Sequence, residues 1–390
     1  MPKAVGGDDN PLYDCPPCEG AGDDLRSPAV RTALVRVGLV SLCTLLLGGS
    51  VSAAPSKRAA PPRTVTVLTY NVFLGTDLNP IFQARSVQQL FGAVATGWAQ
   101  IQANDFRARA RAIARLIAQA KPDLVGLQEA ELYRTQTPPD GPLTPATRVA
   151  YDYVAILLAA LRARGAAYRA VVLASNVDAE LPAGVPAQLD VRLNDRVAIL
   201  ARVERKPRFS LSSPQVGHFA TRLTVQTVGG PILVPRGWAS VDVQPVGGRP
   251  FRFVTTHLEA FSREINVAQG TELLQGPAAT ALPLVLVGDF NSRADRTGTP
   301  TYGNLVAGGL GDAWSERYPG TPGLTCCHQD DLRASPPDLG SRIDLVLTRG
   351  AFRPLRGAVI GEEQRDRAGA GGLWPSDHAG LWLTLRLPGR

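Results

Sequence analysis

A short aliphatic run followed at once by polar residues constrains this sequence more than any other feature. The run is Leu284–Val287, and Gly288-Asp289-Phe290-Asn291 follows it without a break. An all-aliphatic run of this length is typical of a buried strand, and polar residues at strand ends project into the crevice beyond an open α/β sheet. We therefore expect a carboxylate and a carboxamide at the functional edge of a sheet in an α/β fold.

The rest of the sequence alternates between strand-like and helix-like segments. Strands are expected over residues 64–70, 123–129, 171–173, 197–203, 238–243, 251–256, 343–347 and 381–387, where β-branched and aliphatic residues dominate. Apolar residues recur on one helix face over 105–120 and 151–164, and Pro122 ends the first helix. Residues 181–188 predict a loop, and residues 246–248 predict the turn of a hairpin. This alternation indicates a layered α/β sandwich with mixed sheets.

The N-terminal region predicts a secretory signal peptide over residues 31–54. Arg31 and Arg36 precede an apolar stretch at 37–47, and small residues follow it up to Ala54. The apolar stretch is too short for a membrane span. We interpret residues 1–30 as a disordered or mis-annotated leader, 55–63 as a linker and 64–390 as a single domain. The expected location is extracellular.

Charge and cysteine content point to a basic protein that does not depend on disulfides for its fold. The chain has 41 basic and 34 acidic residues, a net charge of +7. Residues 1–54 hold 4 basic and 6 acidic residues, so their removal raises the net charge to about +9. This charge favours polyanionic or membrane-surface partners, although an arginine-rich proteome of high GC content would give the same excess. Only Cys326 and Cys327 remain beyond the signal peptide, which excludes a disulfide-rich scaffold.

Polar side chains stand at the ends of several predicted strands. They are Asn71, Glu129, His257, Asp289, Asn291, Asp377 and His378. Carboxylate and amide oxygens suit a hard divalent cation, and imidazole can transfer a proton near neutral pH. A set of this kind suits the hydrolysis of a phosphate ester.

The combined pattern resembles the endonuclease/exonuclease/phosphatase superfamily, which includes pancreatic deoxyribonuclease, abasic-site endonucleases, inositol phosphatases and bacterial sphingomyelinases. The matching pieces follow the family's order from about residue 64 to the C-terminus. They are Thr69-Tyr70-Asn71-Val72, Gln128-Glu129, Val197-Ala198-Ile199-Leu200, Thr255-Thr256-His257-Leu258, Gly288-Asp289-Phe290-Asn291, Arg342-Ile343-Asp344-Leu345-Val346 and Ser376-Asp377-His378. The resemblance implies a four-layer α/β sandwich, with two mixed β-sheets flanked by helices, and a metal-dependent phosphodiesterase.

The resemblance also implies ligands for Mg²⁺ or Mn²⁺ and contacts to substrate. Glu129 is the expected acidic ligand, with Asn71 beside it and Asp377 as a further carboxylate on the metal side. Asn71 is also an expected substrate contact. Arg196 departs from the family pattern, in which some relatives carry a glycine before Val197, and it could reach a phosphate. Arg196 is preceded by Asp195, and it could instead pair with that residue.

The remaining motif residues are implied to act on the attacking water and the phosphate. Asp289 would position or deprotonate the water, and Asn291 would donate a hydrogen bond to the phosphate. His378 and His257 would contact the phosphate as general acid/base or as stabilisers of charge. Asp344, expected inside its strand, would fix the ring of His378.

Several of these residues also have ordinary structural interpretations. Glu129 could be an exposed strand-end acid, and His257 could be a core histidine with satisfied hydrogen bonds. Asp77 could contact the metal or substrate, but its position favours a helix N-cap. Cys326 and Cys327 could form a metal site or a vicinal disulfide, or be buried thiols. We expect His218 at the surface.

The leading hypothesis from the sequence is a secreted, monomeric phosphodiesterase whose substrate is a nucleic acid. The alternatives are a sphingomyelinase-like phospholipid phosphodiesterase at a membrane surface and a sugar or inositol phosphatase. An alternative of another class is a binding module that keeps the fold without catalysis.

Overall fold

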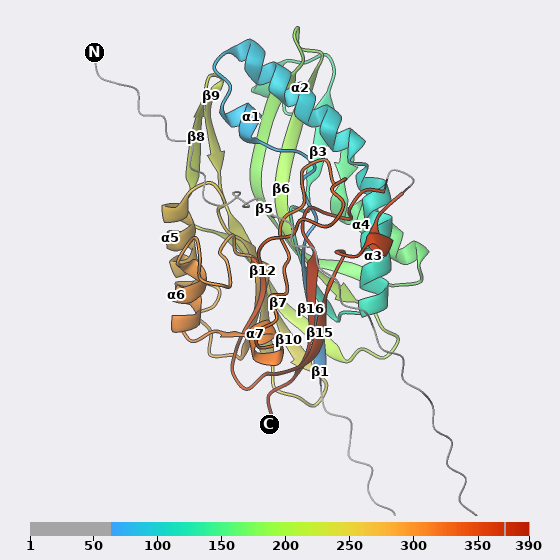
Figure 1. Ribbon diagram of the computed structural model, residues 1–390, viewed down its shortest axis with the longest axis vertical. Coiled ribbons are helices and arrows are strands. Elements are labelled where there is room, and N and C mark those ends of the chain that lie inside the picture. Colours follow the sequence, from blue (N-terminus) through green and yellow to red (C-terminus); the bar gives the residue numbers. More distant parts are fainter. Residues whose placement is uncertain (1–63, 370–371, 390) are drawn as a thin grey trace, which may run out of the picture. The chain divides into compact units, whose positions relative to one another are not determined.

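The computed structural model describes residues 64–369 and 372–389 (Figure 1). All of these residues belong to one of the two units into which the chain divides. The predicted leader at 1–30, signal peptide at 31–54 and linker at 55–63 lie outside the described residues. None of the helices in the described ranges is long and apolar enough to cross a membrane.

The first sheet has eight strands within the described residues. Its order is β15 (Arg353–Ile360), β16 (Gly380–Arg386), β1 (Thr64–Asn71), β2 (Leu124–Gln128), β6 (Leu189–Arg202), β3 (Leu132–Gln136) and β4 (Arg148–Asp152), and β5 (Tyr168–Ala183) also pairs with β6. The β1–β2 pair is parallel and the other pairs are antiparallel, so the sheet is mixed.

The second sheet has six strands within the same ranges. Its order is β13 (Gly311–Asp312), β14 (Asp344–Arg349), β12 (Leu284–Asp289), β11 (Phe251–His257), β10 (Gly237–Pro245) and β7 (Phe209–His218). Here the parallel pair is β11–β12. A separate hairpin joins β8 (Leu223–Thr227) to β9 (Gly230–Val234). The predicted hairpin around residues 246–248 is confirmed, because β10 and β11 pair on either side of it.

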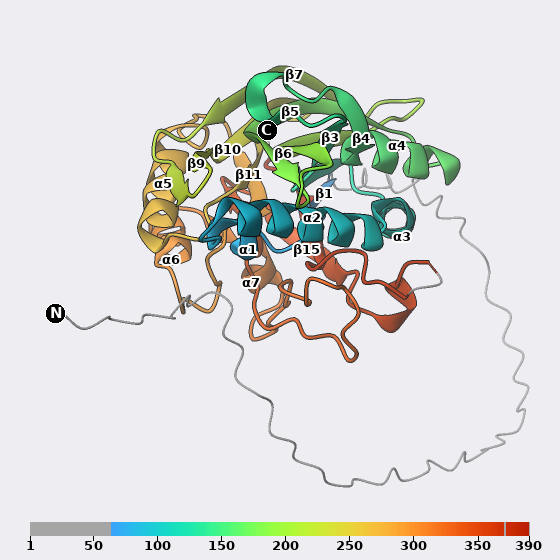
Figure 2. The same cartoon turned by 90° about the horizontal axis from the view of Figure 1, so that it is seen from above.

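The two sheets pack face to face, and helices cover their outer faces. Val67 of β1 and Val285 of β12 belong to one buried cluster between the sheets. The outer face of the first sheet packs against α2 (Val87–Ala103), α3 (Phe106–Ala120) and α4 (Tyr153–Ala163). The outer face of the second sheet packs against α5 (Arg263–Gln275) and α6 (Thr301–Ala307). Figures 1 and 2 show these two groups of helices on opposite sides of the strands. The predicted four-layer sandwich is therefore confirmed.

Four further helical segments among the described residues are short. They are α1 (Asn79–Phe82), α7 (Ala313–Arg317) and the 3-10 turns η1 (Gly141–Leu143) and η2 (Gln364–Asp366). Among the longer helices, α3 follows its sequence signals closely. The Asp105 carboxylate accepts the backbone N–H of Ala108 at 3.0 Å and caps the helix, which ends two residues before Pro122.

The loop predicted over residues 181–188 is shorter than expected. Strand β5 continues to Ala183 and β6 begins at Leu189, so the turn is confined to 184–188. Pro182 lies opposite Asp190 in this pairing. Among the described residues β5 pairs with β6 alone, and a proline on such a strand costs no second ladder of hydrogen bonds. The proline-rich composition therefore gave the wrong prediction for 181–183.

The sheets approach each other closely at Gly126 of β2. A Cβ atom on this residue would lie 2.5 Å from Oγ1 of Thr255 and 2.6 Å from Cγ2 of Val287, both on the second sheet. Two residues further on, Nε2 of Gln128 donates a hydrogen bond to Oγ1 of Thr255 at 2.9 Å. The glycine and this buried polar bridge set the spacing between the sheets at the end where β2 and β11 deliver Glu129 and His257.

Candidate active site

Three neighbouring strands of the second sheet place one polar residue each at the same level. In the parallel pair β11–β12, His257 lies opposite Asp289, and in the antiparallel pair β12–β14, Asp289 lies opposite Asp344. Asp344 was expected inside its strand, but it is the first residue of β14. The antiparallel β14 starts at the edge where β11 and β12 end, so all three side chains meet there.

The first sheet brings its polar residues to the same place. Asn71 ends β1 opposite Gln128 in the parallel β1–β2 pair, so Glu129 follows at the neighbouring tip. The segment that precedes the antiparallel strand β16 returns past Asn71, where the hydroxyl of Ser376 donates to the backbone oxygen of Asn71 at 2.8 Å. This return positions the last motif, which ends in His378.

The Asp289 carboxylate is the centre of the group. Its Oδ2 lies 3.1 Å from Nδ2 of Asn71, 3.5 Å from Nε2 of His257 and 3.7 Å from Nε2 of His378. Its Oδ1 accepts the backbone N–H of Asn291 at 2.9 Å. Only 1% of the residue is exposed. Burial raises the pKa of Asp289 to about 7, against the opposing influence of His378. Groups from both sheets therefore converge on one oxygen atom.

His378 is held in one orientation by Asp344. Oδ2 of Asp344 lies 2.7 Å from Nδ1 of His378, and both side chains are buried. Burial alone would lower the pKa of His378, but Asp344, Asp377 and Asp289 together raise this pKa well above its usual range. The ring therefore carries positive charge, and its Nε2 faces Asp289.

His257 has a different environment from His378. Its Nδ1 lies 3.1 Å from Nη1 of Arg236, and its Nε2 lies 3.2 Å from Nδ2 of Asn291. Burial lowers the pKa of His257 well below its usual range, and Arg236 and His378 add to the effect. A guanidinium and a carboxamide nitrogen can each only donate, so the neutral ring can accept a hydrogen bond from just one of these two neighbours. The two histidines thus approach Asp289 in different charge states.

Arg236 is a site residue that sequence reasoning missed. It precedes β10, twenty-one positions before His257, and no motif marks it. The predicted hairpin held a usable signal, because its register places Trp238 opposite Thr256. Extending that register by one or two residues brings Arg236 to His257. Arg236 is itself fixed by Asp195 at 3.6 Å and Glu259 at 3.7 Å.

Arg196 is held by partners other than the one expected. Its Nε donates to the backbone oxygen of Ala130 at 2.7 Å, and its Nη2 donates to that of Glu131 at 3.0 Å. Nη2 also forms an ion pair with Asp152 at 2.7 Å, so the expected pairing with Asp195 is wrong. The guanidinium is occupied in holding the segment that follows Glu129. The expected contact between Arg196 and substrate stays a prediction.

Carboxylates gather on the side of the site that was expected to hold a metal ion. Oε1 of Glu129 accepts from Nδ2 of Asn71 at 3.0 Å, and Oε2 accepts the backbone N–H of Leu74 at 2.6 Å. Burial raises the pKa of Asp377 to about 7, and Glu129 and Asp330 add to the rise, although His378 opposes it. Unrelieved negative charge among carboxylate and amide oxygens is what a hard divalent cation would neutralise. Glu129, Asp377 and Asn71 therefore fit the expected metal site.

Asp77 lies beside this acidic group and also has a structural role. Burial raises the pKa of Asp330 to about 6, and Asp77, Asp331 and Glu129 contribute to the rise. The Asp77 carboxylate accepts the backbone N–H of Asn79 at 2.8 Å, at the start of α1. The N-cap residue of α1 is Leu78, so the expected N-cap role of Asp77 is wrong, and its carboxylate forms a turn just before the helix. His218 is exposed at the end of β7, as expected.

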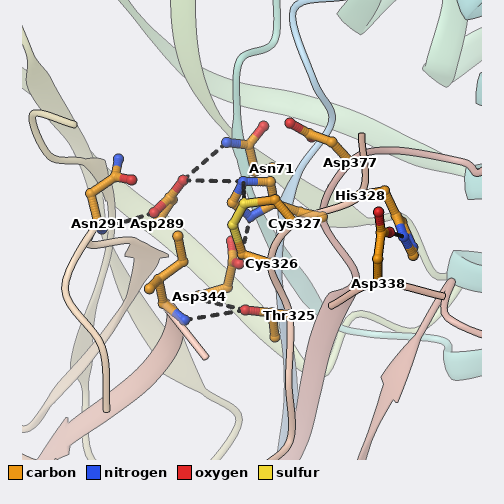
Figure 3. The surroundings of a disulfide bond; sticks show 12 residues. Asn71, Asp289, Asn291, Thr325, Cys326, Cys327, His328, Asp338, Asp344 and Asp377 are labelled. Atoms are coloured by element: carbon orange, nitrogen blue, oxygen red, sulfur yellow. Dashed lines mark hydrogen bonds and ion pairs between the residues drawn. A yellow bond between two sulfur atoms is a disulfide. The ribbon is translucent and has the colours of Figure 1, made fainter. Parts of the chain in front are cut away.

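A disulfide joins Cys326 to Cys327 next to the reaction centre, so the free-thiol interpretation does not describe this structure. Figure 3 shows the pair among Asn71, Asp289, Asp344 and Asp377. Sγ of Cys327 lies 3.8 Å from Nε2 of His378. The disulfide therefore borders the nitrogen that also faces Asp289.

A buried arginine from α3 fixes both loops that carry the site. Arg109 is fully buried, and its guanidinium donates only to backbone oxygens. The acceptors are Asn104 at 2.9 Å, Val72 at 2.8 Å, Pro375 at 3.0 Å and Phe73 at 3.2 Å. The loop after Asn71 and the segment before Asp377 are thereby tied to one side chain.

The structure brings together eight of the nine residues that the sequence nominated for the site. They are Asn71, Glu129, His257, Asp289, Asn291, Asp344, Asp377 and His378. Arg196 is the exception, and Arg236 and Arg109 are additions. The chemical roles assigned to these residues remain predictions.

The chain matches the model of the endonuclease/exonuclease/phosphatase family over residues 68–378. No curated protein matches the sequence significantly. A family protein from Bacteroides thetaiotaomicron is 17% identical with a TM-score of 0.52, over 84% of this chain and 98% of that one. An endonuclease/exonuclease/phosphatase from Beutenbergia cavernae is 20% identical with a TM-score of 0.51, over 84% and 72%. A humanized D. rerio TDP2 with 14 mutations is 19% identical with a TM-score of 0.50, over 83% and 98%. At these identities the likeness shows the fold alone.

Replacing Arg109 with leucine should lower the free energy of unfolding by roughly 3–5 kcal/mol, because four buried backbone oxygens lose their donor. Arg111 lies on the same helix but is exposed, so Arg111→Leu should change stability by less than about 0.5 kcal/mol. Urea denaturation of the two variants measures the difference. Equal effects would show that the buried guanidinium is not the tie described above.

Proposed function

The chain belongs to the endonuclease/exonuclease/phosphatase family, whose members are phosphoesterase hydrolases, and we propose that it is a divalent-metal-dependent phosphodiesterase. The proposal rests on the groups that surround the Asp289 carboxylate. One buried carboxylate meets the Asn71 amide and two imidazoles that differ in charge state. Such a group can accept a proton from water while donors on either side stabilise a phosphoryl group.

The family is generally dependent on divalent metal ions, and the acidic side of the site fits one. We expect Glu129, Asp377 and Asn71 to hold Mg²⁺ or Mn²⁺ through carboxylate and amide oxygens. When bound, the cation would polarise a phosphoryl oxygen and offset the charge that develops on it. The remaining steps fall to side chains of the chain itself.

Asp289 has the position of the group that orients and deprotonates the attacking water. The water oxygen would attack phosphorus while its proton passes to the carboxylate, and the bond from phosphorus to the leaving oxygen would break. We expect the neutral ring of His257 and the neighbouring amide of Asn291 to donate hydrogen bonds to the phosphoryl oxygens. His378 presents the proton of Nε2 while Asp344 holds its Nδ1. A positively charged donor held in one orientation stabilises the negative charge that develops on the phosphoryl oxygens in the transition state more than a mobile donor does.

We propose an extracellular nucleic acid as the substrate. Two properties of the sequence support this choice, namely the net charge of about +9 beyond residue 54 and the predicted signal peptide. A polyanion gains affinity through the release of its counterions at basic residues, and a neutral head group does not. The phospholipid and sugar phosphate alternatives remain outcomes of the test below.

Asp289→Asn and His378→Asn should each lower turnover of a bis-aryl phosphodiester by roughly 10²–10⁴-fold, because each removes a proton-transferring or charged group. Asp289→Asn preserves side-chain shape and His378→Asn puts a smaller polar group in place of the ring, so circular dichroism and thermal unfolding should show a folded protein. His218→Asn is the matched control, because His218 is exposed at the end of β7, and it should keep full activity. Metal-dependent turnover that survives in both site variants would contradict the assignment.

Chelation of divalent cations should abolish activity, and millimolar Mg²⁺ or Mn²⁺ should restore it and raise the melting temperature. In Glu129→Gln, half-maximal activity should need roughly 10-fold more Mg²⁺, since one charged ligand is lost. Glu316→Gln on α7 removes an exposed carboxylate elsewhere and should change neither value. A melting temperature that does not respond to either cation would favour the non-catalytic binding module.

Plasmid DNA, RNA, sphingomyelin vesicles and inositol phosphates should be compared as substrates at equal protein concentration. We expect a nucleic acid to be cleaved fastest, with kcat/KM falling steeply between about 50 mM and 200 mM salt. Faster cleavage of sphingomyelin or of a monoester, or a rate on DNA that ignores salt, would overturn the substrate proposal and leave the phosphoesterase proposal intact.

A further inference from the structure

The two adjacent cysteines and His378 form a compact group of nitrogen and sulfur atoms. Sγ of Cys326, Sγ of Cys327 and one ring nitrogen of His378 all lie within 4.8 Å of one another. The sulfur of Cys327 is 3.8 Å from Nε2. The proposed phosphodiesterase reaction makes no use of either sulfur. Their position beside Nε2 therefore calls for a chemical explanation of its own.

Backbone hydrogen bonds, and not only the disulfide, hold these residues in place. The oxygen of Cys326 accepts the N–H groups of Gly340 and Ser341, at 2.6 and 2.9 Å, and its N–H donates to the oxygen of Ser341 at 2.9 Å. On the other side, the N–H of Ala379 donates to the oxygen of Thr325 at 2.8 Å. The segments that carry the sulfurs and the imidazole stay adjacent when the disulfide opens, because none of these bonds involves a sulfur atom.

His378 is already oriented as a metal-binding histidine. Histidine ligands usually donate their second ring N–H to a carboxylate, which fixes the tautomer and the direction of the free nitrogen. Asp344 receives Nδ1 at 2.7 Å and leaves Nε2 on the side of Cys327. Two thiolates and an imidazole are soft donors of the kind that Zn²⁺ prefers, whereas the oxygens of Glu129, Asn71 and Asp377 suit a hard cation.

We propose that the reduced form of the chain binds one Zn²⁺ ion through Cys326, Cys327 and His378, and that this ion removes His378 from the reaction. The oxidised form has no thiolates to offer and leaves His378 free. Zinc binding stands on the geometry alone, whereas the loss of activity rests on the role of His378 under the proposed function.

The redox step is a thiol–disulfide exchange with a low-molecular-weight thiol. Cys327 is partly exposed and Cys326 is buried, so the first thiolate attacks Sγ of Cys327 and Cys326 leaves as a thiolate. A second thiol then releases Cys327. Two molecules of thiol supply two electrons and two protons, and they leave as one disulfide. Zn²⁺ then displaces the cysteine protons and the proton of Nε2, which pass to solvent.

Zinc binding is measured on the full chain, reduced with a phosphine or left oxidised, by competition with a chromogenic chelator. We expect the reduced protein to bind a single Zn²⁺. The oxidised protein should bind Zn²⁺ with an affinity at least roughly 10-fold lower, or not at all. Co²⁺ in place of Zn²⁺ should give a thiolate-to-metal absorption band in the reduced protein only. Equal affinity in both redox states, or no such band, would overturn the proposal.

Variants separate this site from the expected hard-metal site. In the reduced state, Cys327→Ser and His378→Asn should each weaken zinc binding roughly 10-fold or more. Glu129→Gln should leave it unchanged because Glu129 belongs to the other group of ligands, and His218→Asn controls for surface histidine. Unchanged zinc affinity in Cys327→Ser would overturn the proposal, and so would a loss of affinity in Glu129→Gln equal to that in Cys327→Ser.

Activity then tests the second half of the proposal. Zinc at concentrations that fill the site should inhibit the reduced protein in the presence of Mg²⁺, and the oxidised protein should resist the same concentrations. Zinc that binds with the sulfur signature but does not inhibit would overturn the proposed withdrawal of His378 and leave the binding site standing. An absence of binding in a protein that remains an active phosphodiesterase would overturn the zinc site alone.

Discussion

The guanidinium of Arg109 is the interaction on which the geometry of the site depends. It lies in a fully buried position on α3 and donates to four backbone oxygens from three separate segments. One of these segments follows Asn71 at the end of β1, and another precedes Asp377 and His378. Main-chain oxygens cannot move without unfolding their loops, so a single rigid side chain sets the distance between the first and the last motif of the chain. The ring of Phe106 packs 5.0 Å from the guanidinium and covers it from the helix side.

Strand register supplies the rest of the geometry. The two strands of a parallel pair have their carboxyl ends at the same edge of the sheet. The pairs β1–β2 and β11–β12 therefore each place two polar residues at that edge. Asp289 ends β12 of the second sheet and His378 lies two residues before β16 of the first, yet their side chains lie 3.7 Å apart. Buried carboxylates and imidazoles at this spacing adjust one another's proton affinity, which is why His378 is charged and His257, held by Arg236, is neutral.

The sequence was sufficient to predict features whose cause is local. Aliphatic runs that end in polar residues identified the strands that carry the site and their tips, and Asp105 with Pro122 bounded α3. Partners that meet only in the folded chain were missed. Arg236 reaches His257 across a hairpin, and the partner of Arg196 proved to be Asp152, far away in the sequence. Arg109 could have been found, because its spacing from Phe106 and Ile113 places it on the apolar face of its helix. A charged residue on such a face must have buried partners, and no pattern names them in advance.

The contact at Gly126 makes the reaction centre sensitive to sliding of one sheet over the other. Asn71 stands on the first sheet and Asp289 on the second, and the hydrogen bond of 3.1 Å between them spans the seam. Translation of the sheets by the width of one methyl group would break that bond and separate the carboxylates around Glu129 from the imidazoles around Asp289. Because Gly126 has no side chain, Thr255 and Val287 of the second sheet pack directly against its backbone. This packing resists sliding of one sheet over the other. The alignment of two halves of a reaction centre thus depends on the absence of a side chain at a position that touches no substrate.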